Sequence, residues 1–151
     1  MAKFELYHPI LTPHYRLDWL TQFTVKDVNA LRQQRFPNET LLETATYINR
    51  EMSTVMHDQA LTWGIQDKVT EAFNGSATLS KTDDGLGLLS LTLTTDADRS
   101  ALIHDLVTYM NDFSRSELGA TQFAVQADNA DEVLTSLGFN YDATHNYYVA
   151  A

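Results

Sequence analysis

Three strand patterns follow one another in the middle of the chain, and the third leads through a short turn into a helix. Apolar and polar side chains alternate within residues 60–66 and 86–94, and residues 71–80 form the strand pattern between them. The helix that follows is expected to carry an apolar stripe. Beside this stripe lies His104, which we expect to be a partly buried structural histidine. That stripe consists of Leu102, Ile103, Leu106, Val107, Met110 and Phe113. Strands in succession, followed by crossover helices, predict a mixed α/β sheet.

Two helices are expected before these strands. Thr24 is a typical N-cap, and it predicts a helix that runs to about Arg35. Thr40 is followed three residues later by Glu43, which is a capping box, and the second helix should run to about His57. Its apolar face is expected to contain Leu41, Ala45, Ile48, Met52 and Val55.

The two ends of the chain complete the predicted element order. A short strand is expected at residues 16–20, another at 121–127, a short helix at 129–139 and a final strand from His145. One more short strand is expected around residues 139–141. A length of 151 residues fits one domain, so we expect residues 1–151 to form a single domain.

The composition excludes several classes of function. Twenty Asp and Glu against ten Lys and Arg give a net charge of −10, which disfavours nucleic acid and anionic membranes as partners. That charge either serves solubility or suits a cationic or amine-bearing partner. The absence of cysteine excludes disulfides and thiolate chemistry. The N-terminal residues lack the apolar core of a signal peptide, no apolar run is long enough to span a membrane, and no metal-ligand spacing is present. We therefore expect a cytoplasmic protein without a metal.

The turn between the third strand and the long helix carries Asp96 and Asp98 and no glycine. A helix N-terminus is a common phosphate site because its first N–H groups lack partners. Aspartate also caps a helix and complements its dipole, so these carboxylates could take the place of a phosphate. Two unit charges about 4 Å apart repel by roughly 1 kcal/mol in water and about 4 kcal/mol at an effective dielectric of 20, which Arg99 could offset in part. Self-capping and phosphate binding both remain open.

Four segments, in this order, resemble the GNAT superfamily of N-acetyltransferases, in the branch that acetylates ribosomal-protein N-termini. They are RLDWLTQFTVKDVNAL, LTWGIQDK, NGSATL and EVLTSLGF, and the resemblance covers about residues 14–150. It implies an acyl-CoA N-acyltransferase fold, with a central mixed, mostly antiparallel sheet flanked by helices. Asn74-Gly75 alone would suggest a hairpin turn, whereas the resemblance implies that Gly75 lies inside a strand.

The resemblance also implies an activity and its residues. The donor would be acetyl-CoA, and the acceptor would be an amine-bearing small molecule or a protein N-terminus. A homodimer is compatible with the superfamily. For the general acid we select Tyr141 from the C-terminal tyrosines, with Tyr147 and Tyr148 as the other candidates. Paired aromatics in a terminal strand more often serve core and edge packing, which is the alternative interpretation. The implied cofactor-binding residues are Leu91, Leu93, Thr95, Ala97, Arg99 and Ser100.

Three positions depart from the pattern of the superfamily. The pyrophosphate motif Q/R-x-x-G-x-G/A falls on residues 94–99, or on 96–101 in a shifted frame, and neither frame contains a glycine. Leu134 stands at the position of the usual catalytic tyrosine, and residues 127–130 do not match the N-x-x-S of the branch. The alternative to an enzyme is therefore a catalytically inactive GNAT-fold domain that acts as a binding or interaction protein.

Overall fold

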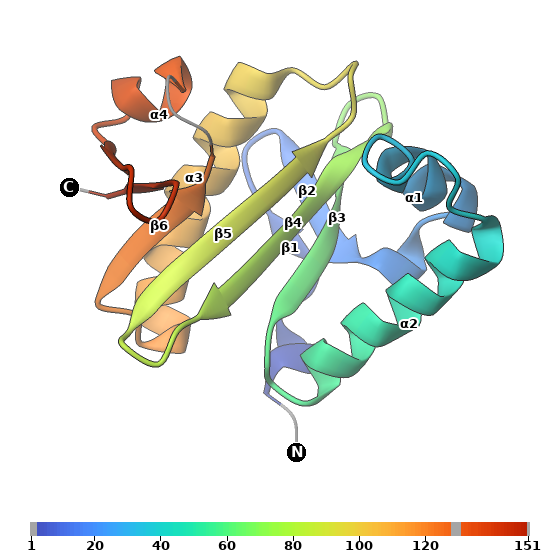
Figure 1. Ribbon diagram of the computed structural model, residues 1–151, viewed down its shortest axis with the longest axis horizontal. Helices are drawn as coiled ribbons and strands as arrows, with labels where there is room; N and C mark the ends of the chain where they lie inside the picture. The colour runs from blue at the N-terminus through green and yellow to red at the C-terminus, as the bar shows by residue number, and fades with distance from the viewer. Residues whose placement is uncertain (1–2, 128–130, 151) are drawn as a thin grey trace. The chain divides into compact units, whose positions relative to one another are not determined.

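A computed structural model describes residues 3–127 and 131–150 of the chain. The chain divides into an N-terminal unit, residues 1–77 with 92–97, and a C-terminal unit, residues 78–91 with 98–151. Two strands contribute residues to both units: β4 (Phe73–Lys81) and β5 (Leu86–Leu93). Figure 1 shows the course of the chain through these elements.

The N-terminal unit combines three antiparallel strands with two helices that contact each other. β1 pairs with β2 and β2 with β3, and α2 packs against β3 (Figure 1). The Trp19 and Trp63 rings stack with their centroids 6.1 Å apart, and both side chains are buried. The elements are η1 (Phe4–Leu6), β1 (Ile10–Leu11), β2 (Tyr15–Trp19), η2 (Leu20–Gln22), α1 (Val25–Arg32), α2 (Leu41–Met56) and β3 (Leu61–Asp67).

Both predicted helix starts in this unit are confirmed. Thr24 Oγ1 accepts from the Asp27 N–H, and Thr40 forms the complete capping box of α2. α1 ends at Arg32, before the predicted end. The prediction that Leu41 lies on the buried face of α2 is wrong, because this first helical residue is 54% exposed. The buried face begins one turn later, at Thr44.

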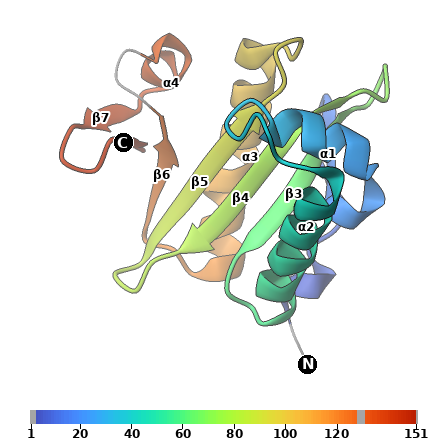
Figure 2. The same cartoon turned by 45° about the vertical axis from the view of Figure 1, so that its right-hand side comes forward.

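The C-terminal unit contains the parallel pair of strands. β5 pairs in parallel with β6 (Gln122–Gln126) from Leu86 to Ser90, and β8 (Tyr147–Val149) pairs antiparallel with β6 and with β7 (Asn140–Asp142). α3 (Arg99–Leu118) packs against β6, and the short α4 (Glu132–Ser136) contacts β7 (Figure 2).

The apolar stripe of α3 is buried as predicted, but the prediction for His104 is wrong. All six stripe residues are buried, whereas His104 is exposed. At 100° per residue, His104 lies on the side of the helix roughly opposite to the stripe. His104 is therefore exposed although its neighbours in the sequence are buried.

The sheet confirms the predicted fold class. The described strands are hydrogen-bonded in the order β1-β2-β3-β4-β5-β6-β8-β7. The β5–β6 pair is parallel, while β2 pairs antiparallel with β1 and β3, and β8 pairs antiparallel with β6 and β7. Gly75 lies inside β4 with a φ of 147°, so the hairpin-turn alternative is wrong. The sequence patterns missed the two-residue β1, whereas β7 was predicted. Part of the helix predicted at residues 129–139 lies outside the described residues.

Candidate functional site

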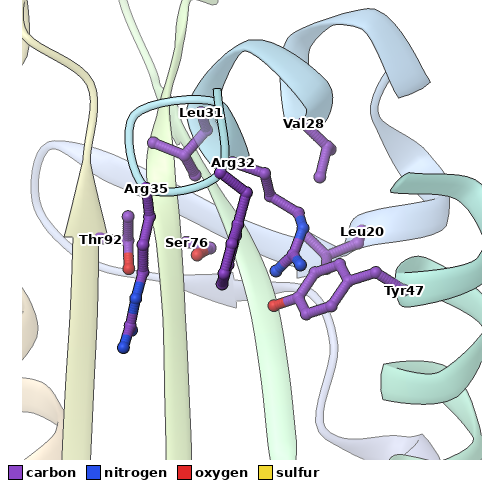
Figure 3. Close-up of a pocket in the computed structure, with 9 residues that line it drawn as sticks. Leu20, Val28, Leu31, Arg32, Arg35, Tyr47, Ser76 and Thr92 are labelled. Atoms are coloured by element: carbon purple, nitrogen blue, oxygen red, sulfur yellow. The ribbon is translucent and has the colours of Figure 1, made fainter. Parts of the chain in front are cut away.

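A pocket of about 160 Å³ opens in the N-terminal unit (Figure 3). Residues from α1, from the segment that follows it, from α2 and from the two central strands line it. They are Leu20, Val28, Leu31, Arg32, Arg35, Phe36, Tyr47, Ser76 and Thr92. The lining combines an apolar floor with two guanidinium groups and three hydroxyl groups, and it contains no carboxylate. A hollow that combines apolar walls with convergent polar groups is a candidate small-molecule site.

Arg32 is held by a carboxylate outside the pocket lining. Its Nε and Nη2 atoms donate to the two oxygens of Glu39 at 2.6 and 2.8 Å. This bidentate pair raises the pKa of Arg32 and, through the hydrogen bond from Arg32, lowers the pKa of Glu39. The charge of Arg32 is therefore largely compensated within the protein.

Buried polar side chains fix Glu39 in turn. Thr44 Oγ1 donates to Glu39 Oε2 at 2.7 Å, and Asn29 Nδ2 donates to both Thr44 Oγ1 and the Glu39 carbonyl. Thr44 is fully buried and Asn29 is 8% exposed. The segment between α1 and α2 is thus tied to both helices, which makes this wall of the pocket a fixed structure rather than a free loop.

Tyr47 presents both a ring and a hydroxyl group to the pocket. The Arg32 guanidinium carbon lies 3.6 Å from the centroid of the Tyr47 ring, which is a close cation–π contact. Burial, reinforced by the charge of Glu51, raises the pKa of the Tyr47 phenol above its ordinary value of 10.0. Tyr47 therefore stays protonated at neutral pH, and a hydrogen bond with Glu51 adds to the rise in its pKa.

Arg35 differs from Arg32 in having no partner of opposite charge. Within residues 3–127 and 131–150, no ion pair joins Arg35 to a carboxylate. Its side chain is exposed and extends from the segment after α1 along the strands (Figure 3). Its guanidinium lies 5.7 Å from the centroid of the Phe36 ring. Arg35 therefore provides the lining with an uncompensated positive charge.

The strand wall of the pocket depends on a close approach at Gly75. A Cβ atom placed on Gly75 would lie 2.2 Å from the Thr92 carbonyl oxygen and 2.9 Å from the Leu93 Cα. Beyond this point the Thr94 N–H donates to the Asn74 carbonyl at 2.9 Å. Thr92 of the lining is thus the neighbour of Leu93, one of the residues that the resemblance assigns to the cofactor.

The turn after β5 holds Asp96 through a local hydrogen bond. Thr94 Oγ1 donates to Asp96 Oδ1 at 2.6 Å, and the Ala97 N–H donates to the Thr94 carbonyl. Thr95 and Asp96 are exposed. Asp96 therefore stabilises the turn itself and does not cap the following helix.

Asp98 is the N-cap of α3, which confirms the self-capping hypothesis for this residue. Its Oδ1 atom accepts from the Ala101 N–H at 3.1 Å. The N–H groups of Arg99 and Ser100 make no hydrogen bond to the described part of the chain, and both residues are exposed. Two helix N–H donors therefore stay available to an anion, beside a carboxylate that would repel it.

The side chain of Arg99 is engaged elsewhere in the C-terminal unit. It pairs with Asp131, the N-cap of α4, whose Oδ1 also accepts from the Leu134 N–H at 3.0 Å. Burial alone would raise the pKa of Asp131, but the hydrogen bonds from Arg99 and Leu134 outweigh it and lower the pKa. The pair engages Nη2 of Arg99 and compensates part of the charge that a phosphate would otherwise meet.

The expected catalytic positions lie near the C-terminus. Tyr141 donates its hydroxyl hydrogen to Asn146, and its ring lies 5.1 Å from that of Tyr148. Tyr148 is buried, and its hydroxyl accepts from the Asp131 N–H. Leu134 is fully buried. Residues 128–130, part of the expected N-x-x-S position, lie outside the described residues.

The sequence alone did not predict any of the polar residues that line the pocket. The missed residues are Arg32, Arg35, Tyr47, Ser76 and Thr92. The signal that could have found the first two is their spacing: two arginines three residues apart at the end of a helix, in a chain with only ten basic residues. In the described residues, no group of three His, Asp or Glu side chains is placed to hold a metal ion. No helix in that part of the chain is long and apolar enough to cross a bilayer.

Several solved structures with a similar fold carry the names of acetyltransferases. A candidate ribosomal-protein-serine acetyltransferase from Vibrio cholerae matches 93% of this chain and 94% of its own, with a TM-score of 0.74 and 13% identity. The ribosomal-protein-S5-alanine acetyltransferase from Vibrio fischeri matches 93% of both chains, with a TM-score of 0.67 and 14% identity. The spermidine/spermine N-acetyltransferase from Vibrio cholerae matches 90% of both chains, with a TM-score of 0.65 and 10% identity. The chain therefore has the GNAT fold. No family profile and no curated protein matches the sequence.

Proposed function

We propose that this protein is an N-acetyltransferase that transfers an acetyl group from acetyl-CoA to an amine. The observation that carries the proposal is the pocket on a GNAT fold, with Thr92 in its lining and Leu93 next along the same strand. Neighbouring structures on this fold act, by their names, on ribosomal proteins and on polyamines. An acceptor amine held in the pocket would reach the strand to which the resemblance assigns the thioester.

The residues of this chain fit acetyl-CoA in part. The exposed N–H groups of Arg99 and Ser100 would bind the pyrophosphate, and the backbone of Leu91 and Leu93 would position the thioester. When bound, acetyl-CoA would supply an activated acyl carbon: the amine would form a C–N bond to it as the C–S bond breaks, the proton of the amine would pass to solvent, and CoA would leave as the thiol. Tyr141 remains our proposed general acid, and it would have to release Asn146 to donate its proton.

A second candidate is a catalytically inactive domain that binds a ligand or partner. Its specific support is that Asp98 already satisfies one N–H group of α3, and that a fully buried leucine stands where many relatives carry the catalytic tyrosine. The pocket would then bind a small molecule without transferring an acyl group to it.

Calorimetric titration of acetyl-CoA into the purified protein, at low and at moderate salt, distinguishes the two. Micromolar affinity that weakens with salt would support the enzyme, because phosphate contacts are screened by ions. Release of CoA thiol on addition of amines then completes the test. Absence of heat at millimolar acetyl-CoA would leave only the binding protein.

A further inference from the structure

The pocket lining contains an uncompensated cation, Arg35, in a chain whose net charge is negative. The net charge is −10, yet the polar groups of the lining are two guanidiniums, a neutral phenol and two aliphatic hydroxyls. Two carboxylates act on lining residues without belonging to the lining: Glu39, which is bound to Arg32, and Glu51, which interacts with Tyr47. The long-range field of the protein attracts cations, whereas the short-range contacts inside the pocket favour an anionic group.

We infer that the acceptor is an amine that also carries a carboxylate, and that Arg35 binds this carboxylate. This inference rests on the proposed acetyltransferase function and specifies its substrate class. Arg35 has the charge, the bidentate geometry and no internal partner in the described chain. The Ser76 hydroxyl in the same lining is a further hydrogen-bond donor.

Arg32 has a different role from Arg35. Two of its nitrogen atoms are committed to Glu39, and its planar face lies over the Tyr47 ring. It therefore positions Tyr47 and Glu39 and is not the group that recognises the ligand. Removing Arg32 would leave the carboxylate of Glu39, only 10% exposed, without its ion-pair partner, so Arg32 is a poor probe of ligand binding.

The apolar part of the lining selects the rest of the acceptor. Leu20, Val28 and Leu31 are buried, and the Phe36 ring forms part of the lining. An amino acid with an apolar side chain has the charge pattern and the surface that these residues would bury. A polyamine would place several cations next to Arg35, which costs binding energy.

The decisive experiment measures binding of matched ligands by calorimetry, without any cofactor. The probes are leucine and phenylalanine, each against its own amide, together with spermidine. We expect the amino acids to bind at millimolar concentration or tighter, and each amide, which lacks the carboxylate, to bind about tenfold more weakly. Arg35→Gln should weaken amino-acid binding about tenfold, with Arg35→Lys in between. Lys26→Gln removes an exposed cation of α1 outside the pocket and should change nothing.

The outcomes separate this inference from the proposed function. Equal binding of amide and acid, unchanged binding in Arg35→Gln, or no binding of either amino acid would overturn the carboxylate inference. Equal binding of the amide would instead indicate a peptide N-terminus as acceptor. Acetyl transfer to spermidine in preference to the amino acids would reject the inference while upholding the enzyme. Arg35-dependent amino-acid binding without any acetyl transfer would uphold the pocket and reject the enzyme.

Discussion

Two charged segments of this chain lie at helix ends, one at the end of α1 and one before α3. Each carries a charge of the same sign as the ligand that the resemblance leads us to expect there. The last residue of α1, Arg32, and the segment after it, with Arg35, line a pocket where an amine acceptor is expected. The turn before α3 presents Asp96 and Asp98 where an anionic cofactor is expected. Fold similarity therefore predicts where ligands bind, while the side chains decide which ligands those are.

The two segments also differ in how their charges are compensated. In the turn, both carboxylates accept local hydrogen bonds, from Thr94 and from the Ala101 N–H. In the pocket segment, Glu39 compensates Arg32, and Arg35 is left to solvent. Both carboxylates of the turn are therefore engaged by local donors, whereas the charge of Arg35 has no partner in the described chain. This contrast favours ligand binding at the pocket more strongly than at the turn.

The largest effect is expected at Gly75, which supports the strand wall of the pocket. Gly75→Ala should cost about 4 kcal/mol of unfolding free energy, because its φ of 147° strains any side chain and its Cβ would meet the Thr92 carbonyl. Gly119→Ala is the matched control, since Gly119 also has a positive φ but no atom within 4 Å. Urea unfolding of both variants is the measurement. Equal losses would mean that crowding against β5 contributes nothing.

Glu39→Ala should be the next most damaging change, at about 3 kcal/mol, because it leaves Arg32 and the buried Thr44 hydroxyl without their acceptor. Glu39→Gln keeps an acceptor oxygen and should cost less. Denaturant melts give both values. If the two variants lose the same stability, then the charge of Glu39, and not its hydrogen bonding, stabilises this wall of the pocket.

Sequence reasoning succeeded where the physics is local and missed contacts between distant residues. The caps at Thr24, Thr40 and Asp98 each join residues three apart, so composition and spacing were enough. The pocket depends on α2 folding back onto α1, which brings Thr44 to Asn29, 15 residues away. Arg99 was expected to face phosphate, but Asp131, 32 residues further on, binds it. No pattern in one sequence reports such a partner.

Acid should weaken both regions through carboxylates whose pKa is lowered. Glu39 and Asp131 have folded pKa values below their unfolded values of about 4.3 and 3.9. Their stabilisation is therefore present above pH 5 and is lost as the pH falls through the folded pKa values. Thermal melts between pH 7 and pH 3 should show this decline, and it should be less steep in Asp131→Asn. An unchanged slope in that variant would exclude Asp131 as a contributor.

The smallest change in stability, and the sharpest test of the turn, is expected from Asp98. Asparagine caps a helix as well as aspartate does, so Asp98→Asn should keep the stability of the protein, while Asp98→Ala should lose about 1 kcal/mol. The negative charge of Asp98 is expected to have a separate effect, on the affinity for acetyl-CoA. If Asp98 repels the pyrophosphate through water, Asp98→Asn should tighten acetyl-CoA binding about fivefold, which is the roughly 1 kcal/mol of one such repulsion. Calorimetry of acetyl-CoA with the native protein and both variants measures this. Unchanged affinity in a stable Asp98→Asn protein would mean that the cofactor does not approach the α3 N-terminus, and the pocket would then be the site from which to define the ligand.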